Sequence, residues 1–200
     1  VPGSVSPMIA CGRVIKKLHP EAVTVFVGPC IAKKSEAREP DLAGAVDYVL
    51  TFREVEDIFE AAGIDPASMP ESEKDHSSRA GRIYARTGGV SEAVRTTVEQ
   101  LNPNRRITVR TRQADGVPAC RAMIEELKSG KSDANFFEGM GCVGGCVGGP
   151  KAIRRKEEGR ELVNAYGDAA PYKTPLENTY VIELLHKLGF ETVEKLLENS

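Results

Sequence analysis

The stretch Ala134-Asn-Phe-Phe-Glu-Gly-Met-Gly-Cys-Val-Gly-Gly-Cys-Val-Gly-Gly-Pro150 joins a short apolar run to a loop of glycines and two cysteines. The run from Ala134 to Glu138 has the length of a strand. Glycine lets the backbone approach a bulky inorganic group closely, and amide N–H groups stabilise thiolates. We therefore expect Cys142 and Cys146, four apart on a helical turn, to point toward one ligand. A glycine-rich loop with two buried thiols is the alternative that this spacing leaves open.

Other metal sites match this spacing less well. A zinc ribbon prefers paired C-x-x-C knuckles, which the sequence lacks. A radical-SAM cluster would need a third cysteine at the position of Gly149. The two cysteines therefore indicate a different kind of metal site.

A third cysteine, Cys30, has a similar setting. It follows the β-branched run Val23–Val27, so we expect it at the carboxyl end of a strand, where open α/β sheets bind their ligands. Pro29 fixes the turn, and Lys33 lies one helical turn onward, where its ammonium can reach an anionic ligand. A solvated surface lysine is the alternative for Lys33.

Helical and strand-like patterns alternate along the rest of the chain. The expected strands are residues 23–27, 46–50, 107–111 and 134–138, and the expected helices are 6–20, 51–63, 87–102 and 116–130. A further helix is expected after the capping box Thr174–Glu177, and a last amphipathic piece carries Val193, Leu196 and Leu197. This alternation predicts an α/β fold of two lobes with mainly parallel sheets flanked by helices, and a cluster cleft between the lobes.

The predicted boundary is the loop of residues 64–81, which is rich in Asp, Ser, Pro, Glu and Lys. Residues 1–63 form the first lobe segment, with the Cys30 motif. Residues 82–200 form the second lobe, with the glycine-rich cysteine motif and the C-terminal helices. Cys11 and Cys120 align with apolar residues at helical spacing, so we expect both to pack in the core.

Composition excludes several classes of protein. The 200 residues are 40% hydrophobic and 28% charged, as in soluble globular proteins. With 27 Lys+Arg against 29 Asp+Glu, the net charge of −2 argues against a nucleic-acid partner. No apolar stretch reaches the roughly 18 residues that cross a membrane. Five cysteines, an odd number, favour reduced thiols that serve a metal. We expect a cytoplasmic protein without a secretory signal, represented by an excised fragment.

Three segments resemble motifs of the iron-only (FeFe) hydrogenases. Gly28–Ala37 is similar to their P-C-x-x-K-K-x-E motif, and Glu138–Gly149 to their E-x-M-x-C-x-x-G-C-x-x-G-G motif. Between them, Thr87–Ala93 resembles the family's T-G-G-V-x-E-A segment. The resemblance covers most of the chain and implies the C-terminal part of the large subunit's catalytic domain.

The resemblance implies a cofactor, the H-cluster, that reversibly reduces protons to hydrogen. In this family a 4Fe-4S cubane is joined through a cysteine thiolate to a two-iron subcluster carrying carbon monoxide, cyanide and an amine-containing dithiolate. Carried over by motif, Cys30 and Cys142 would ligate the cubane, and Cys146 would ligate it and bridge to the two-iron unit. Lys33 would hydrogen-bond an iron-bound cyanide. Met140 and Pro29 would shape the two-iron pocket.

The sequence departs from the family at two points. The family's T-S-C-C-P-like motif, which supplies the fourth cubane cysteine and a proton-relay cysteine, is not in this chain. We therefore expect the fragment alone to be inactive, with an absent or incomplete cluster. Gly28 stands where catalytic members commonly have Met, as in the sensory or regulatory branch.

These departures leave two alternative functions open. One is a hydrogen or redox sensor, and the other is a hydrogenase-like iron-sulfur assembly protein without the two-iron unit. For an enzyme, the expected partners are hydrogen, protons and an electron carrier, such as a ferredoxin or a fused iron-sulfur domain. The chain has no C-x-x-C-x-x-C run of its own for that relay.

Overall fold

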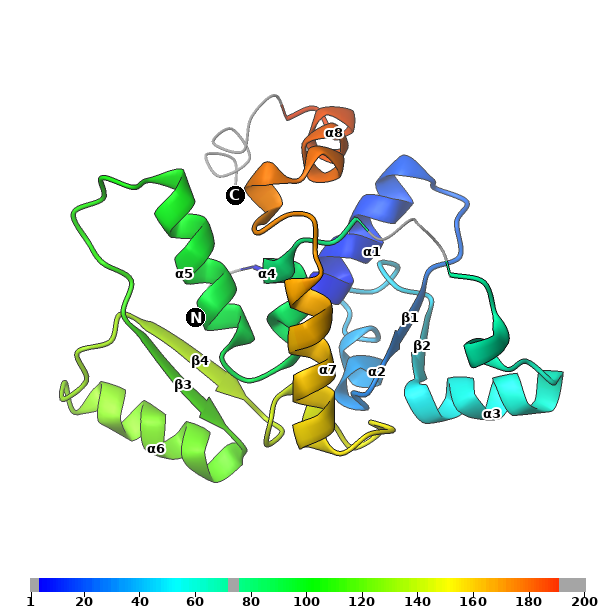
Figure 1. The fold of residues 1–200 in the computed structure, drawn as a ribbon, viewed down its shortest axis with the longest axis horizontal. Coiled ribbons are helices and arrows are strands. Elements are labelled where there is room, and N and C mark those ends of the chain that lie inside the picture. Colours follow the sequence, from blue (N-terminus) through cyan, green and yellow to red (C-terminus); the bar gives the residue numbers. More distant parts are fainter. Residues whose placement is uncertain (1–3, 72–75, 191–200) are drawn as a thin grey trace. The chain divides into compact units, whose positions relative to one another are not determined.

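The computed structural model describes residues 4–71 and 76–190 of a chain that divides into two compact units. The first unit comprises Val1–Glu71 and Pro150–Ile153, and the second comprises Ser72–Gly149 and Arg154–Ser200. Each unit contains a two-stranded parallel sheet with helices beside it (Figure 1), which confirms the α/β fold. In the described part of the chain no helix is both long and apolar enough to cross a bilayer. The amphipathic piece predicted around Val193 lies outside the described residues.

The first unit alternates helices and strands. Strand β1 pairs with β2 in parallel, with Val25 opposite Tyr48 and Gly28 opposite Thr51. Both strands lie slightly later in the sequence than predicted. The elements are α1 (Pro7–Leu18), β1 (Val25–Gly28), α2 (Ala32–Glu36), β2 (Tyr48–Thr51), α3 (Phe52–Ala62) and a short 3₁₀ helix (Pro66–Ser68).

The core of the first unit lies between α1 and the segment before β2. It is built from Met8 and Ile9 of α1 together with Ala45 and Val46. A Cβ on Gly12 would lie 2.2 Å from the carbonyl oxygen of Ala45, so only glycine allows this close approach of helix and loop. The cysteine predicted in this core is exposed instead. Cys11 is not packed among the core side chains, so that prediction is wrong.

Helix α3 begins and ends as the sequence predicts. Thr51 and Glu54 form the reciprocal capping box, and Gly63 ends the helix at φ 66°. The helix is poorly covered, however, because α3 has no buried residue and Phe52 and Ile58 are 36% and 50% exposed. A sheet of two strands offers too little surface to cover an apolar helix face.

Two ion-paired carboxylates hold the first unit together at β1 and β2. Asp47 accepts hydrogen bonds from Lys16 and from the backbone N–H of Thr24, both at 2.7 Å. Glu54 accepts hydrogen bonds from Lys34 at 2.6 Å and from the backbone N–H of Thr51 at 2.7 Å. The lysine hydrogen bonds, followed by the backbone ones, lower the pKa of both carboxyls to about 2.

Acid should therefore weaken the first unit. A lowered pKa contributes stability above the group's ordinary pKa, here 3.8 for Asp47 and 4.5 for Glu54, and that stability is lost as the pH falls toward about 2. Urea unfolding of the chain across this range should show a decline that the double variant Asp47→Asn, Glu54→Gln flattens. Asp41→Asn, on an exposed side chain of the same unit, serves as the control. An equally steep decline in the double variant would contradict the assignment.

The second unit is built on strands β3 and β4, which pair in parallel from Thr111 opposite Phe136 to Asp115 opposite Met140. Helices α5 and α6 pack on opposite faces of this sheet (Figure 1). Its elements are α4 (Arg79–Arg82), α5 (Gly89–Leu101), β3 (Thr111–Asp115), α6 (Val117–Lys128), β4 (Phe136–Met140), α7 (Lys156–Asp168), α8 (Thr179–Lys187) and 3₁₀ helices at Ile83–Ala85, Cys146–Gly148 and Pro175–Glu177.

Two predictions in the second unit are wrong. The strand predicted over residues 107–111 lies at β3 instead, and Ile107 is 69% exposed. Pairing with β4 outweighs the β-branched composition of the earlier run. The residues Thr174–Glu177 form a 3₁₀ turn rather than a capping box, and the side chain of Asn178 caps α8 by accepting from the N–H of Tyr180 at 3.0 Å.

Candidate functional site

The predicted ligands divide between the two units. Cys30 belongs to the first unit, and Cys142 and Cys146 belong to the second. All five cysteines of the sequence lie among the described residues and are thiols rather than disulfide partners. Cys30 and Cys142 are half-buried, and Cys146 is exposed.

The loop that carries Cys142 and Cys146 is not a helical turn, which corrects the sequence-based expectation. Between the two cysteines, Gly144 and Gly145 adopt φ values of 89° and 83°, a conformation that side-chain-bearing residues rarely take. Only after them does a short 3₁₀ helix, Cys146–Gly148, begin. The consecutive left-handed residues reverse the chain within the C-x-x-x-C spacing.

Backbone hydrogen bonds close this loop on itself. The N–H of Gly145 donates to the carbonyl of Cys142 at 3.0 Å, and the N–H of Gly149 donates to the carbonyl of Cys146 at 2.9 Å. A Cβ on Gly148 would lie 1.9 Å from the carbonyl oxygen of Val143. The glycines therefore allow a backbone packing that no larger residue would permit.

Asp115 and Thr87 attach the loop to the rest of the second unit. Asp115, at the end of β3, accepts hydrogen bonds through Oδ2 from the N–H of Gly144 at 2.8 Å and from the hydroxyl of Thr87 at 2.9 Å. The N–H of Thr87 donates to the carbonyl of Gly144 at 3.1 Å. Gly144 is thus held through both its N–H and its carbonyl.

The charge of Asp115 is favoured where it lies. The hydrogen bond from the Gly144 N–H, then that from Thr87, lowers the pKa of this carboxyl, and the positive charges of Lys156 and Arg160 in α7 act in the same direction. The side chain is therefore an anion at neutral pH, and its hydrogen bonds are charge-assisted.

Glu138, which is 4% exposed, links β4 to the start of α5. Its two carboxylate oxygens accept from the N–H groups of Gly88 and Ser91, each at 2.7 Å. These N–H groups belong to the first turn of the helix, where no intrahelical acceptor is available. The T-G-G segment and the glycine-rich segment are therefore in direct contact through Glu138.

A buried arginine completes this polar network. Arg86 is 8% exposed, donates to Asn164 at 2.6 Å, and pairs with Glu92 at 2.5 Å. Its backbone forms a β-bridge with Gly145. Neither Arg86 nor Asp115 could be predicted as a site residue from the sequence, because each acts through contacts with distant residues and neither lies in a cysteine motif.

In the first unit, Cys30 lies in the turn between β1 and α2. The carbonyl of Pro29 accepts from the N–H of Lys151 at 3.1 Å, and this hydrogen bond stays within the first unit, to which Pro150–Ile153 belongs. A Cβ on Gly28 would lie 2.8 Å from the ring of Phe26. Gly28 therefore has a local packing explanation.

The contacts of Lys33, Met140 and Cys120 complete the description of the residues singled out in the sequence. Lys33 pairs with Glu36 at 2.5 Å within α2, and neighbouring Lys34 pairs with Glu54. Met140 ends β4, and its carbonyl accepts from the N–H of Gly116 at 2.9 Å. Cys120 is half-buried beside β3 and β4, with Sγ 3.4 Å from the Met140 carbonyl oxygen.

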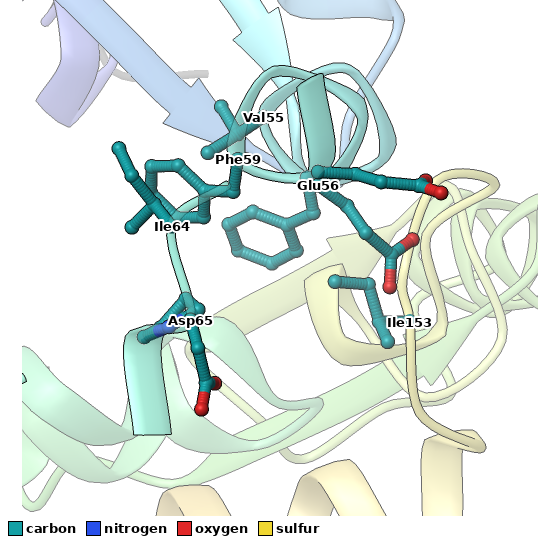
Figure 2. A pocket seen from close by; sticks show the side chains of 9 residues that line it. Val55, Glu56, Phe59, Ile64, Asp65 and Ile153 are labelled. Atoms are coloured by element: carbon teal, nitrogen blue, oxygen red, sulfur yellow. The ribbon is translucent and has the colours of Figure 1, made fainter. Parts of the chain in front are cut away.

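A groove in the first unit lies apart from these residues. It has a volume of about 510 Å³, and Figure 2 shows Phe59, Ile64 and Ile153 around it, with Glu56 and Asp65 among its lining. It contains none of the predicted ligands.

The donor set itself fits an iron-sulfur cluster, since thiolates are the usual ligands of such clusters. The absence of side chains at Gly144, Gly145 and Gly148 allows the tight path of the loop that carries two of these thiols. Within residues 4–71 and 76–190, no three His, Cys, Asp or Glu side chains are grouped as ligands of a single metal ion.

Comparisons with known proteins identify the family of the chain. The family model of the iron-only hydrogenase large subunit, C-terminal domain, matches residues 1–150. The periplasmic Fe hydrogenase large subunit of Nitratidesulfovibrio vulgaris is 32% identical over 166 residues, which cover 66% of this chain and 39% of that protein. The NADP-reducing hydrogenase subunit HndD of Solidesulfovibrio fructosivorans is 28% identical, over 82% of this chain and 34% of that protein. The chain thus spans between a third and two fifths of these relatives.

A solved structure shows the same fold. It is an FeFe-hydrogenase studied for the oxygen-induced modification and degradation of the 2Fe subcluster of its H cluster. It matches with a TM-score of 0.71 and 22% identity, over 96% of this chain and 66% of that one. With the family match over residues 1–150, the chain belongs to the C-terminal domain family of iron-only hydrogenase large subunits.

Proposed function

We propose that the chain is the part of an iron-only hydrogenase that supplies Cys30, Cys142 and Cys146 to the H-cluster, for the reversible reduction of protons to hydrogen. The observation that supports this most is the Cys142–Cys146 loop, which Asp115 and Thr87 hold at the carboxyl end of a parallel sheet. Open α/β sheets bind their ligands at that edge.

Three thiolates are one fewer than a cubane requires. In the proposed assignment Cys30 and Cys142 would hold the 4Fe-4S cubane, and Cys146 would hold both the cubane and the two-iron unit. A fourth cysteine would be needed besides these three, so the isolated chain should be largely without cluster and inactive. When bound, the H-cluster would supply the electron transfer.

The turn that carries Cys30 is held within the first unit. The N–H of Lys151 donates to the carbonyl of Pro29, next to Cys30.

Lys33 would donate a hydrogen bond to an iron-bound cyanide. Its ammonium pairs with Glu36 in the structure, and its side chain is only partly exposed, at 26%. An ammonium in that setting can shift from one anion to another without a new charge being buried. Met140 and Pro29 would shape the two-iron pocket and limit the access of water.

Gly28 does not by itself favour a sensory role, because the ring of Phe26 occupies the space beside it. The protein is therefore proposed to be an enzyme with hydrogen and protons as substrates and an electron carrier as partner. Its proposed location is the cytoplasm.

Spectroscopy of the full-length protein after cofactor maturation tests this function. Wild type should contain the cubane iron and sulfide and show the infrared bands of bound carbon monoxide and cyanide. Cys142→Ser should lose both signatures. Lys33→Met should keep the cubane, which cysteines alone hold, but lose most of the infrared bands, because the cyanide loses its charge-assisted hydrogen bond.

The control for Lys33→Met is Lys17→Met, on an exposed side chain of the same unit. Lys34 is unsuitable because its ion pair with Glu54 supports the start of α3. A wild type that binds no iron-sulfur cluster would contradict the proposed function. A cubane without infrared bands would instead indicate an assembly protein.

A further inference from the structure

The Cys142–Cys146 loop has few apolar contacts to fix its shape. Val143, between the two cysteines, is 50% exposed, and Gly144 contributes no side chain. Consecutive left-handed glycines also have high conformational freedom when unfolded, so ordering them is entropically costly. Polar contacts from outside the loop therefore add to the hydrogen bonds that the loop makes with itself.

Asp115 makes such a contact from a rigid element. Its position on β3 is set by pairing with Met140 of β4, two residues before Cys142. The same carboxylate oxygen then binds the N–H of Gly144 and the hydroxyl of Thr87. The end of β3 is thus connected to the middle of the loop by one side chain.

Thr87 contacts both Asp115 and Gly144. Its hydroxyl donates to Asp115 while its own N–H donates to the carbonyl of Gly144. Gly144, Asp115 and Thr87 therefore form a closed set of three hydrogen bonds. Rotation of the Gly144 peptide groups would break at least one of them.

We propose that Asp115 is a positioning residue, which fixes the Gly144 peptide and so holds Cys142 and Cys146 in their ligating arrangement before a cluster binds. That Cys142 and Cys146 are ligands rests on the proposed function, whereas the fixed conformation of the loop is a property of the cluster-free chain. Asp115 touches no reacting atom in this scheme, and it acts through the loop.

Hydrogen exchange of the cluster-free chain, resolved by residue with NMR, tests whether Asp115 fixes the Gly144 peptide. Asp115→Asn removes the negative charge, and Asp115→Ala removes both hydrogen bonds. The Gly144 amide should exchange about tenfold faster in Asp115→Asn and faster still in Asp115→Ala. Thr87→Val removes only the hydroxyl and should give an intermediate increase. Asp133→Asn, on an exposed side chain of the same unit, is the matched control and should leave the exchange unchanged.

A pH titration supplies a second readout. The chemical shift of the Gly144 amide proton should follow the ionisation of Asp115, with a pKa below the ordinary 3.8. The charged side chains that face Asp115 are Lys156 and Arg160 of α7. The titration step should be absent from Asp115→Asn.

Cluster retention in the matured full-length protein tests the second part. Removal of the cubane by a chelator should be about tenfold faster in Asp115→Asn than in wild type and Asp133→Asn, and the electron paramagnetic resonance spectrum of the reduced cubane should broaden. If wild type holds its cluster, either of two results would overturn the inference. One is a Gly144 amide exchange rate that is unchanged in both Asp115 variants, and the other is an unchanged rate of cluster removal. A wild type without cluster would overturn the proposed function, and with it this second part, but not the exchange result.

Discussion

Gly148→Ala is expected to abolish cluster retention in the full-length protein. The new Cβ would lie 1.9 Å from the carbonyl oxygen of Val143, far inside contact distance, and the opposing atom is backbone that cannot move aside without opening the loop. The loop would lose its packing at a cost of about 3 kcal/mol, and Cys142 and Cys146 would no longer be held for one ligand. Iron and sulfide analysis after maturation should find most of the cluster missing.

Gly141→Ala is the matched control for this experiment. Gly141 lies in the same glycine-rich segment, but a Cβ there meets no atom within 4 Å and the residue does not have a positive φ. This variant should therefore bind as much iron as wild type. Equal cluster content in the two alanine variants would show that the tight path of the loop is unnecessary for binding.

Glu138→Ala should give the largest loss of folding stability in the second unit. The change leaves the buried N–H of Ser91 and the partly buried N–H of Gly88 without their acceptors. Each unsatisfied donor costs roughly 1–3 kcal/mol, so the free energy of unfolding should fall by about 3 kcal/mol. Urea unfolding of the chain, followed by circular dichroism, measures this difference.

Two comparisons make the Glu138 result specific. Glu138→Gln keeps one acceptor oxygen and should lose about half as much stability. Glu125→Ala removes a side chain that is 70% exposed and paired with Lys128 on the helix surface, and should change stability by less than about 0.5 kcal/mol. A similar loss for Glu125→Ala and Glu138→Ala would contradict the role of Glu138 as a helix anchor.

The helix predicted over residues 51–63 is present, because its capping box and its end at Gly63 depend on neighbouring residues only. The capping box predicted at Thr174–Glu177 is absent, so such local signals are not always decisive. Longer-range features were harder to predict. Strand β3, with the polar sequence Thr-Arg-Gln-Ala-Asp, forms because β4 pairs with it, whereas the more β-like run around Ile107 remains exposed.

The site shows the same division. The density of glycine around Cys142 and Cys146 revealed the loop, because that signal lies within a few residues. The helical placement of the two cysteines was wrong, since spacing alone cannot report the left-handed φ of Gly144 and Gly145. The contact between Asp115 and Thr87 spans 28 residues and has no motif of its own. Such contacts require the sheet to be known first.

The return of Pro150–Ile153 to the first unit has a consequence for biosynthesis. A ribosome releases this segment only after the whole of Ser72–Gly149 has emerged. The hydrogen bond from Lys151 to Pro29 therefore forms late, and the turn that carries Cys30 is completed only when Cys142 and Cys146 are already outside the exit tunnel. During translation, the hydrogen bond that completes the Cys30 turn cannot form before Cys142 and Cys146 have been synthesised.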